Sequence, residues 1–318
     1  MAAPYGTSFD FGGTVASNAA GYDTGTRVLD MMPGITLLDP AKTPLLSMLN
    51  RGAPLLKTST PNWLNDSLDA IGDNAISEGA DYTFTDPSIS TRTQNVCRTI
   101  EKTAKVSTVT EAEQHYDGGS NTMSERQHQL KLKFMALKRD VEWALINSEI
   151  AYTSEASAPK NRGIIEAMDD ASHKIDASAA NLSETLFKDN IMKLPYDDGA
   201  EVTDVFAPYS QHVDIDGFTA GIGTKYIDSN QREHIDYVNV YDTLLGRVQL
   251  HVLRDEYMPD TETIFGFDRQ FWEWAWLIPV HAREVSPTGH YWANVITGTG
   301  TLIHRNGKAG ACLHNLAA

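Results

Sequence analysis

The sequence predicts an α+β fold that combines one long helix, a β-rich C-terminal region and extended chain. Residues 124–150 contain no Pro or Gly, and their apolar residues recur every three or four positions, as on one face of a helix about 40 Å long. That apolar stripe consists of Leu130, Phe134, Leu137, Val141 and Leu145. The polar, Thr-rich segment 91–110 is typical of extended chain. From residue 248 onward, short apolar and aromatic runs separated by turn residues indicate strands.

The composition is that of a globular, acidic protein. Of the 318 residues, 41% are hydrophobic and 21% are charged, and the formal net charge is −16. This charge argues against a duplex-DNA-binding protein, which would present a basic face. The distant Cys97 and Cys312 predict free thiols in a reducing compartment. Residues 1–25 lack the features of a signal peptide, and no apolar run approaches the roughly 18 residues of a membrane span, so we expect a chain made in a cytoplasm with no membrane contact.

The N-terminal third predicts arms. Residues 1–27 are Gly-rich and sparsely charged, which is typical of a flexible arm that neighbouring material would hold in place. Thr43-Pro44 predicts a short helix with Thr43 as its N-cap. Two long strands, 75–84 and 91–106, are expected to be joined at the Asp86-Pro87 turn. Because an isolated two-stranded ribbon is marginal in water, we expect this one to lie on another subunit.

Beyond the long helix, the pattern predicts one more helix and a series of strands. Asn181 and Glu184 have the spacing of a capping box for a helix over 181–194. A strand at 201–207 and a Gly- and Asp-rich loop region at 214–230 follow. Further strands are expected at 248–253, 263–267, 271–277, 291–296 and 301–304. Alternation places three tryptophans on one strand face, where they are expected in the core: Trp272, Trp274 and Trp276.

No pattern in the sequence points to catalysis. There is no Walker A sequence, no Gly-x-Ser-x-Gly elbow and no complete dinucleotide-binding fingerprint, so we expect neither an enzyme nor a cofactor. His212, Asp214 and Asp216 alternate, and on a strand they would point the same way, as metal ligands do. An exposed acidic loop explains them more simply, and we expect no metal. A metal-dependent hydrolase that uses these three residues is the alternative from a different class of function.

The long helix is locally basic within an acidic chain. Lys131, Lys133 and Lys138 are candidates to face DNA phosphates if this helix lines a DNA-filled space. Alternatively, they pair along the helix with Asp140 and Glu142.

Several segments, taken in order, are familiar. They are Thr43-Pro44-Leu45, Trp63, Glu78-Gly79-Ala80-Asp81, Gln94-Asn95, Lys105-Val106-Ser107, Leu137-Lys138-Arg139-Asp140-Val141-Glu142, Val238-Asn239-Val240-Tyr241, Gly246-Arg247-Val248 and Asn306-Gly307-Lys308-Ala309. On these segments, and from about residue 27 to its end, the chain resembles the major capsid protein of tailed bacteriophages, which has the Hong Kong-ninety-seven type fold.

The resemblance implies a layout of segments along the chain. These are an N-arm at 1–50, an extended E-loop hairpin at 51–112, a peripheral domain at 113–181 with its spine helix at 124–150, an axial domain at 182–268, and the return strands of the peripheral domain at 269–318. Candidates for contact between subunits are Trp63, Glu78, Asp81, Arg92 and Arg98.

The function implied by the resemblance is structural. The chain would self-assemble through pentamers and hexamers into an icosahedral shell around double-stranded DNA, and would reside in the virion after assembly in the host cytoplasm. Its partners would be other copies of itself, a portal, a cement or decoration protein and, where one is used, a separate scaffolding protein, with only loose contact to DNA. The long scaffolding segment of many relatives has no match here, and no Lys–Asn crosslinking pair is located. An encapsulin-like cellular compartment and a tail or baseplate protein are the alternatives.

Overall fold

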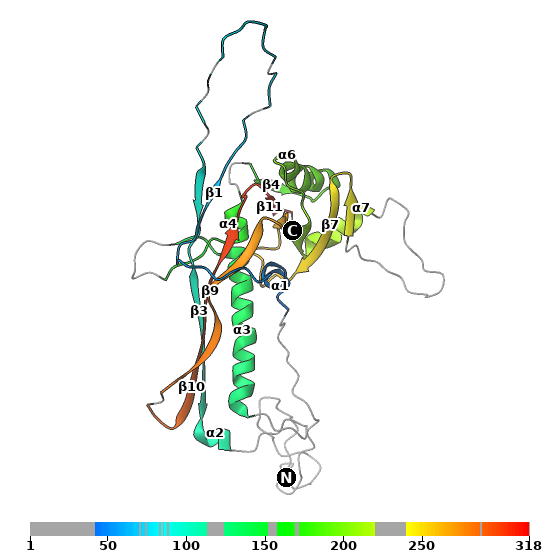
Figure 1. The fold of residues 1–318 in the computed structure, drawn as a ribbon. Helices are drawn as coiled ribbons and strands as arrows, with labels where there is room; N and C mark the ends of the chain where they lie inside the picture. The colour runs from blue at the N-terminus through cyan, green and yellow to red at the C-terminus, as the bar shows by residue number, and fades with distance from the viewer. Residues whose placement is uncertain are drawn as a thin grey trace, which may run out of the picture.

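The computed structural model describes residues 42–112, apart from 70, 74, 83, 85 and 88, and residues 124–151, 158–168, 172–219, 240–286 and 288–317. The expected arm at residues 1–27 lies outside the described residues. Figure 1 shows a long helix beside a tall sheet, a second sheet near the upper end of that helix, and a hairpin that projects away from both. The fold therefore combines α and β elements, as predicted.

The first sheet has the strand order β3–β10–β9 and runs beside helix α3 (Figure 1). Its antiparallel strands are β3 (Arg98–Ser107), β9 (Trp272–Val285) and β10 (Tyr291–His304), and the short helix α2 (Thr108–Ala112) follows β3. Helix α3 spans Glu125–Asn147 and buries Leu137, Val141 and Leu145, while Leu130 and Phe134 are partly buried against the same core. The predicted helix and its apolar stripe are thus confirmed.

The second sheet has six strands in the order β4–β11–β8–β5–β7–β6. They are β4 (Lys174–Ala180), β5 (Asp204–Pro208), β6 (Val240–Thr243), β7 (Gly246–Leu253), β8 (Ile264–Phe267) and β11 (Gly310–Leu316). The helical segments around it are α4 (Ile164–Ala167), α5 (Glu184–Phe187), the π-helix η2 (Lys188–Lys193), α6 (Leu194–Asp197) and α7 (Tyr209–Thr219). The strands predicted at 201–207, 248–253 and 263–267 are confirmed with shifted ends, whereas β4, β6 and β11 were not predicted.

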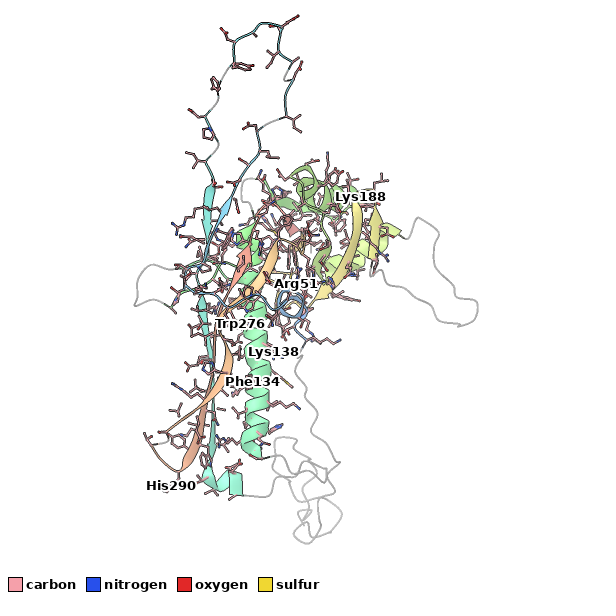
Figure 2. The ribbon with its side chains drawn as sticks, viewed as in Figure 1. Arg51, Phe134, Lys138, Lys188, Trp276 and His290 are labelled. Carbon is pink, nitrogen blue, oxygen red and sulfur yellow. The ribbon has the colours of Figure 1, made fainter. Side chains whose placement is uncertain are left out.

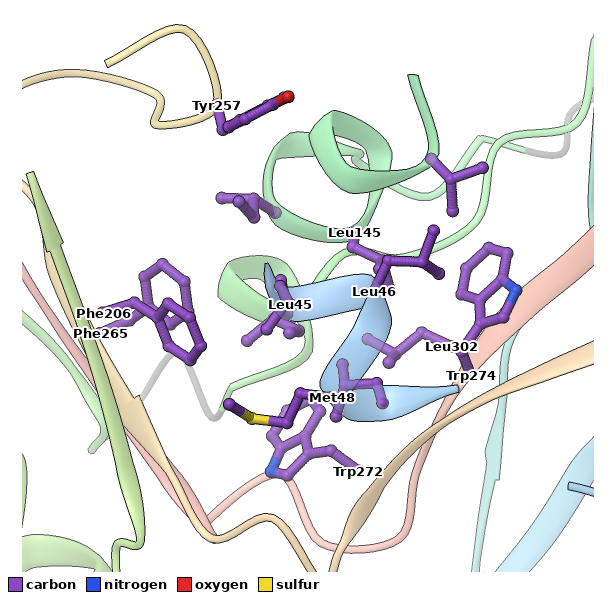
Figure 3. Packing of buried hydrophobic residues seen from close by; sticks show 14 of the residues in the cluster. Leu45, Leu46, Met48, Leu145, Phe206, Tyr257, Phe265, Trp272, Trp274 and Leu302 are labelled. Carbon is purple, nitrogen blue, oxygen red and sulfur yellow. The ribbon is translucent and has the colours of Figure 1, made fainter. Parts of the chain in front are cut away.

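Both faces of the second sheet are buried. Phe206 and Phe265 face a core shared with α1 (Pro44–Leu49), α3, β9 and β10, which Figure 3 shows from close by. Their neighbours Val205 and Ile264 pack in a separate core together with η2. Successive strand residues point to opposite faces, so each strand serves both cores. The layout implied by the resemblance bounds the axial domain at residues 182 and 268. These bounds separate β4 and β11 from the sheet in which they pair.

Local expectations for the segment after β4 are corrected by the structure. The expected helix at 181–194 begins at Glu184, with Ser183 as its N-cap: the Ser183 Oγ accepts a hydrogen bond from the Leu186 amide at 3.3 Å. Asn181 is therefore not the cap. The helical run also continues past Pro195, which lies in the first turn of α6 directly after η2. Residues 214–219, expected in a loop, belong to α7.

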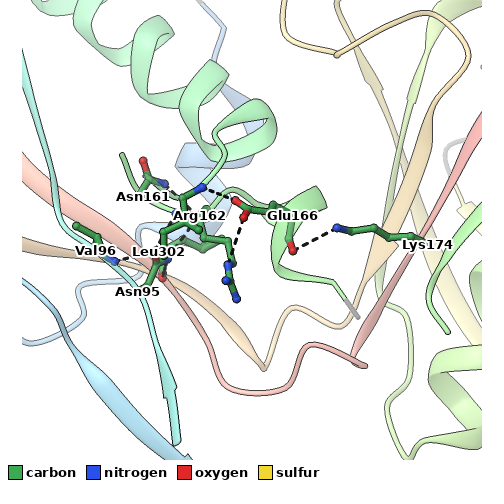
Figure 4. A network of polar contacts seen from close by, with 8 residues as sticks. Asn95, Val96, Asn161, Arg162, Glu166, Lys174 and Leu302 are labelled. Atoms are coloured by element: carbon green, nitrogen blue, oxygen red, sulfur yellow. Dashed lines mark hydrogen bonds and ion pairs between the residues drawn. The ribbon is translucent and has the colours of Figure 1, made fainter. Parts of the chain in front are cut away.

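The hairpin also differs from the expectation. Strand β1 (Asn62–Asn65) pairs with β2 (Thr91–Gln94), and no strand is assigned in the described part of residues 66–90. The expected strand 91–106 is divided at Asn95, whose side chain is fully buried. Its Nδ2 donates to the Leu302 carbonyl at 2.7 Å and its Oδ1 accepts from the Arg162 amide at 2.8 Å (Figure 4). These bonds join three segments and end the pairing of β2 before β3 begins.

Two glycines make room for the aromatic core. Separate strands were expected at 291–296 and 301–304, yet β10 is continuous through Gly298 and Gly300. A Cβ atom at Gly300 would lie 2.7 Å from Cζ2 of Trp274 and 2.9 Å from Cε3 of Trp276. Trp272 and Trp274 are fully buried and Trp276 is partly buried against the same core, so the predicted aromatic face is confirmed.

Gly300→Val should destabilise the folded subunit by about 1 to 3 kcal/mol, because the added atoms force the indole rings or the strand to move. Urea unfolding followed by tryptophan fluorescence measures the change. Gly217→Ala is the matched control, since no atom lies within 4 Å of a Cβ atom at this position in α7 and Ala favours a helix. A Gly300→Val variant as stable as the native chain would contradict the packing argument.

Candidate assembly surface

The segment between β1 and β2, residues 66–90, is called the arm loop here. In Figure 2 its side chains stand on an extended chain that projects from the body. Its large apolar side chains are between 77% and 106% exposed, and they are Leu68, Ile71, Ile76, Tyr82, Phe84 and Ile89. Large apolar side chains gathered on one exposed segment are typical of an interaction site. The arm loop therefore has the character of a segment that is buried only when another molecule covers it.

The arm loop is also strongly acidic. It contains no Lys or Arg, and its carboxylates are Asp66, Asp69, Asp73, Glu78, Asp81 and Asp86. Alternating acidic and apolar residues remain soluble when exposed and can still bury apolar area on a complementary surface.

The five candidates for contact between subunits fall into two groups. Glu78 and Asp81 are exposed on the arm loop. The other three make contacts within the chain: Trp63 packs edge-on against His304 with ring centroids 5.0 Å apart, Arg92 Nε donates to Asn62 Oδ1 at 3.2 Å, and the half-buried Arg98 donates to Ser148 Oγ at 3.4 Å. The sequence therefore picked out an exposed segment through Glu78 and Asp81, but not its exposed apolar side chains, which the local run of Leu, Ile and Phe would have signalled.

The lysines of α3 lie on its surface. Lys131 and Lys138 are exposed and Lys133 is half-buried. The alternative of pairing along the helix is not found, because Asp140 pairs with Lys102 Nζ at 2.6 Å and Glu142 is buried. Within the described ranges, no carboxylate forms an ion pair with these three lysines.

Two hollows meet at Lys138. The larger, about 590 Å³, lies between α1, α3 and the end of β7, and Lys42 and Arg254 lie on its wall. The smaller, about 280 Å³, is an apolar groove between α1, α3 and β9. Its lining includes Leu46, Phe134, Trp276 and Val280. Figure 2 shows Phe134, Lys138 and Trp276 close together beside α3.

A buried carboxylate of α3 holds the N-terminus of α1. Thr43 occupies the predicted N-cap position, but its side chain makes no capping hydrogen bond. Instead, the Leu45 and Leu46 amides donate to Glu142 Oε1 and Oε2 at 2.8 Å and 2.7 Å. These are amides that a helix leaves unpaired at its start. The segment that leads to the N-terminal residues is thereby fastened to the long helix.

The contribution of Glu142 to the stability of the subunit should depend on pH. Burial raises the pKa of Glu142 from 4.5 to about 7, and the two amide hydrogen bonds oppose the rise. Because the folded state binds this proton more tightly than the unfolded state, the contribution to stability is complete below about pH 4.5 and is lost as the pH rises through about 7. It amounts to about 3 kcal/mol at most.

Glu142→Gln, which cannot ionise, should remove this part of the pH dependence. The measurement is urea unfolding of both chains between about pH 5 and about pH 8, and the difference between them isolates Glu142 from the other carboxylates. Parallel pH profiles for the two chains would show that Glu142 keeps an ordinary pKa.

The three residues of the metal alternative lie on a helix and not on a strand. His212 Nδ1 and Asp216 Oδ2 lie 3.6 Å apart, one helical turn from each other on α7. Asp214 is exposed, and because it follows His212 by only two residues, it lies on a different face of the helix. The alternation argument for this site is therefore wrong. In the part of the chain that the structure describes, there is neither a group of three potential metal ligands nor a helix able to cross a membrane.

The chain is similar to known shell proteins in its sequence profile and in its fold. The sequence profile of the family described as "SU10 major capsid protein" matches residues 12–317. The cyanophage A-1(L) capsid asymmetric unit is similar in structure, with a TM-score of 0.70, 10% identity, and coverage of 93% of this chain and 99% of that one. The capsid of a native GTA particle has a TM-score of 0.61, 15% identity, and coverage of 96% and 100%. The holo-SrpI encapsulin complex from Synechococcus elongatus has a TM-score of 0.55, 12% identity, and coverage of 92% and 93%. No curated protein sequence matches significantly.

Proposed function

Since this chain belongs to the SU10 major capsid protein family and so forms the shell of a virus particle, we propose that it builds the head of a tailed phage. The shell is icosahedral, is assembled from pentamers and hexamers in the host cytoplasm, and encloses double-stranded DNA. The family is one of structural proteins, in line with the expectation that the chain is not an enzyme.

The observation that carries this proposal is the exposed arm loop. These apolar side chains are almost fully exposed in one subunit. Burial of each one under a neighbour would contribute about 1.5 to 3 kcal/mol to the free energy of association. The gain is repeated at every subunit of a closed shell, so weak contacts add up to a stable particle. The arm loop is then the outer part of the E-loop at 51–112, which lies across an adjacent subunit.

The other parts of the layout follow from the two sheets. Helix α3 with strands β9 and β10 corresponds to the peripheral domain with its spine helix, and β3, which the layout assigns to the E-loop at 51–112, pairs with β10. The second sheet with α5, η2, α6 and α7 corresponds to the axial domain, enlarged by β4 and β11. Helix α1 lies within the N-arm at 1–50. A portal, a cement protein and a separate scaffolding protein are the partners that such a head would use.

The encapsulin alternative shares the fold but not the family match. The encapsulin structure resembles the chain less closely in TM-score than the cyanophage capsid does. Genes for a portal and a terminase beside this one would favour the phage head, whereas a gene for a cargo enzyme would favour the cellular compartment.

Negative-stain imaging of the purified chain tests the proposal. Closed shells of uniform size are the expected result, with the native scaffolding protein co-expressed if a gene for one lies nearby. Open tubes, which a tail protein would form, or monomers under every condition would overturn it.

A further inference from the structure

We propose that the larger hollow, about 590 Å³ between α1, α3 and the end of β7, binds a small polyphosphate anion of the nucleoside triphosphate class. Lys42, Lys138 and Arg254 would hold the phosphates, and the apolar part of the wall would hold the organic part of the ligand. The site lies within one subunit. It goes beyond the proposed shell function, because an unassembled chain would already bind the anion.

The charge of the wall is the first argument. Three cations line the hollow and no carboxylate does, although the chain has 42 Asp and Glu against 26 Lys and Arg. The cations come from three separate segments: Lys42 precedes α1, Lys138 lies on the middle of α3 (Figure 2), and Arg254 follows β7. Cations that gather around one hollow repel one another, and an anion that enters between them removes this repulsion.

These three cations are not neutralised within the described part of the chain. All three are exposed, and none of them forms an ion pair with a described residue. Carboxylates of α3 and of the turn after β7 are engaged elsewhere, since Asp140 pairs with Lys102 and Glu256 pairs with Arg139. Glu142 directs both of its oxygens to the amides of α1. The positive charge of the hollow is therefore available to a ligand.

The size and the lining of the hollow fit an organic phosphate. Sites for small molecules have volumes of about 300 to 1,000 Å³ and combine apolar walls with a few polar groups. Met135, Val252 and Tyr257 supply apolar and aromatic surface on which a base or a sugar can pack. Thr43 also lines the hollow, and its side chain makes no capping hydrogen bond to α1, so its hydroxyl can donate to a phosphate oxygen.

Duplex DNA is the competing source of phosphate. Its phosphates are spread along the outside of a rod, at one charge per about 1.7 Å of helix axis, and the rod is too wide to enter a hollow of this volume. A free polyphosphate brings several charges into the space between the three cations, where Lys and Arg form charge-assisted hydrogen bonds. The enclosed shape of the site therefore favours the small anion.

Calorimetric titration of unassembled, full-length subunits with ATP in magnesium-free buffer tests the site. We expect one bound ATP per subunit, and an affinity lowered by about tenfold or more in the variant Lys138→Gln/Arg254→Gln. The matched control, Lys193→Gln/Arg283→Gln, removes one Lys and one Arg that are exposed elsewhere, on η2 and β9, and should bind as the native chain does. Absence of ATP binding by the native chain, or an equal loss in both variants, would overturn the inference.

Two competitors separate the small anion from DNA. Inorganic tripolyphosphate should displace ATP, but with lower affinity, because it lacks the groups that pack on the apolar wall. A short DNA duplex at the same phosphate concentration should leave ATP bound. Displacement of ATP by the duplex would assign the cations to DNA and overturn the inference, as would a failure of tripolyphosphate to compete.

Unfolding measurements separate binding from folding. The Lys138→Gln/Arg254→Gln variant should be at least as stable as the native chain in urea, because it loses two charges that repel each other. ATP should raise the Tm of the native chain more than that of the variant, and equal shifts would contradict the site. Subunits that bind ATP but form no shells would refute the proposed shell function and leave this site intact.

Discussion

Replacing residues 66–90 by a two-residue Asn-Gly turn should abolish shell assembly and leave the subunit folded. Asn65 and Thr91 face each other at the end of the hairpin, so a two-residue turn can close it without disturbing β1 or β2. The apolar side chains removed are exposed, so the core of the subunit loses nothing. Electron microscopy and sedimentation report assembly, and urea unfolding reports the fold.

The control for this change keeps the length of the loop. In a variant with Ile71→Ser, Ile76→Ser and Phe84→Ser, assembly should be weakened, because the loop can still reach a neighbour but buries less apolar area. If the shortened chain still forms normal shells, the arm loop does not hold subunits together, and the exposed apolar surface needs another explanation.

Glu142→Ala should destabilise the subunit by about 2 to 5 kcal/mol, because two buried amides lose their acceptor and a small cavity is left. The amides of Leu45 and Leu46 report the local effect, since hydrogen exchange at both should become much faster. Chemical unfolding measures the loss of stability in the whole subunit.

Glu149→Ala is the matched control for this substitution. Glu149 follows the C-terminal end of the same helix and is exposed, so its removal should change stability little. If Glu142→Ala is as stable as this control, the carboxylate does not fasten α1, and the amides find another acceptor.

Some of the fold could be predicted from sequence because its cause is local. The stripe from Leu130 to Leu145 specifies a helix through its spacing alone, and residues 124–150 contain nothing to interrupt it. The alternation of Trp272, Trp274 and Trp276 likewise specified a strand with one buried face. Thr43-Pro44 placed α1 correctly, because Pro at the first helical position acts within one turn.

Other features could not be predicted, because residues far apart in sequence decide them. Asn95 divides an expected strand only because Leu302 and Arg162 offer partners for its amide. The residues around His212 form a helix although their pattern matched a loop, since Ile215 packs into the core beside β5. The start of α3 also depends on a distant residue. Its Arg126 amide donates to the Glu111 carboxylate of α2 at 2.9 Å.

For the assembly surface, the sequence by itself determined a long helix and an extended hairpin arm, and through its family resemblance it implied a shell subunit. Only the tertiary structure decided that Lys131 and Lys138 stay without ion pairs among the described residues, that Lys138 borders an apolar groove, and that Glu142 serves α1 and not a neighbouring lysine. The physical reason is that helical periodicity depends on neighbours three and four positions away, whereas the pairing of a charge depends on whatever the fold brings beside it.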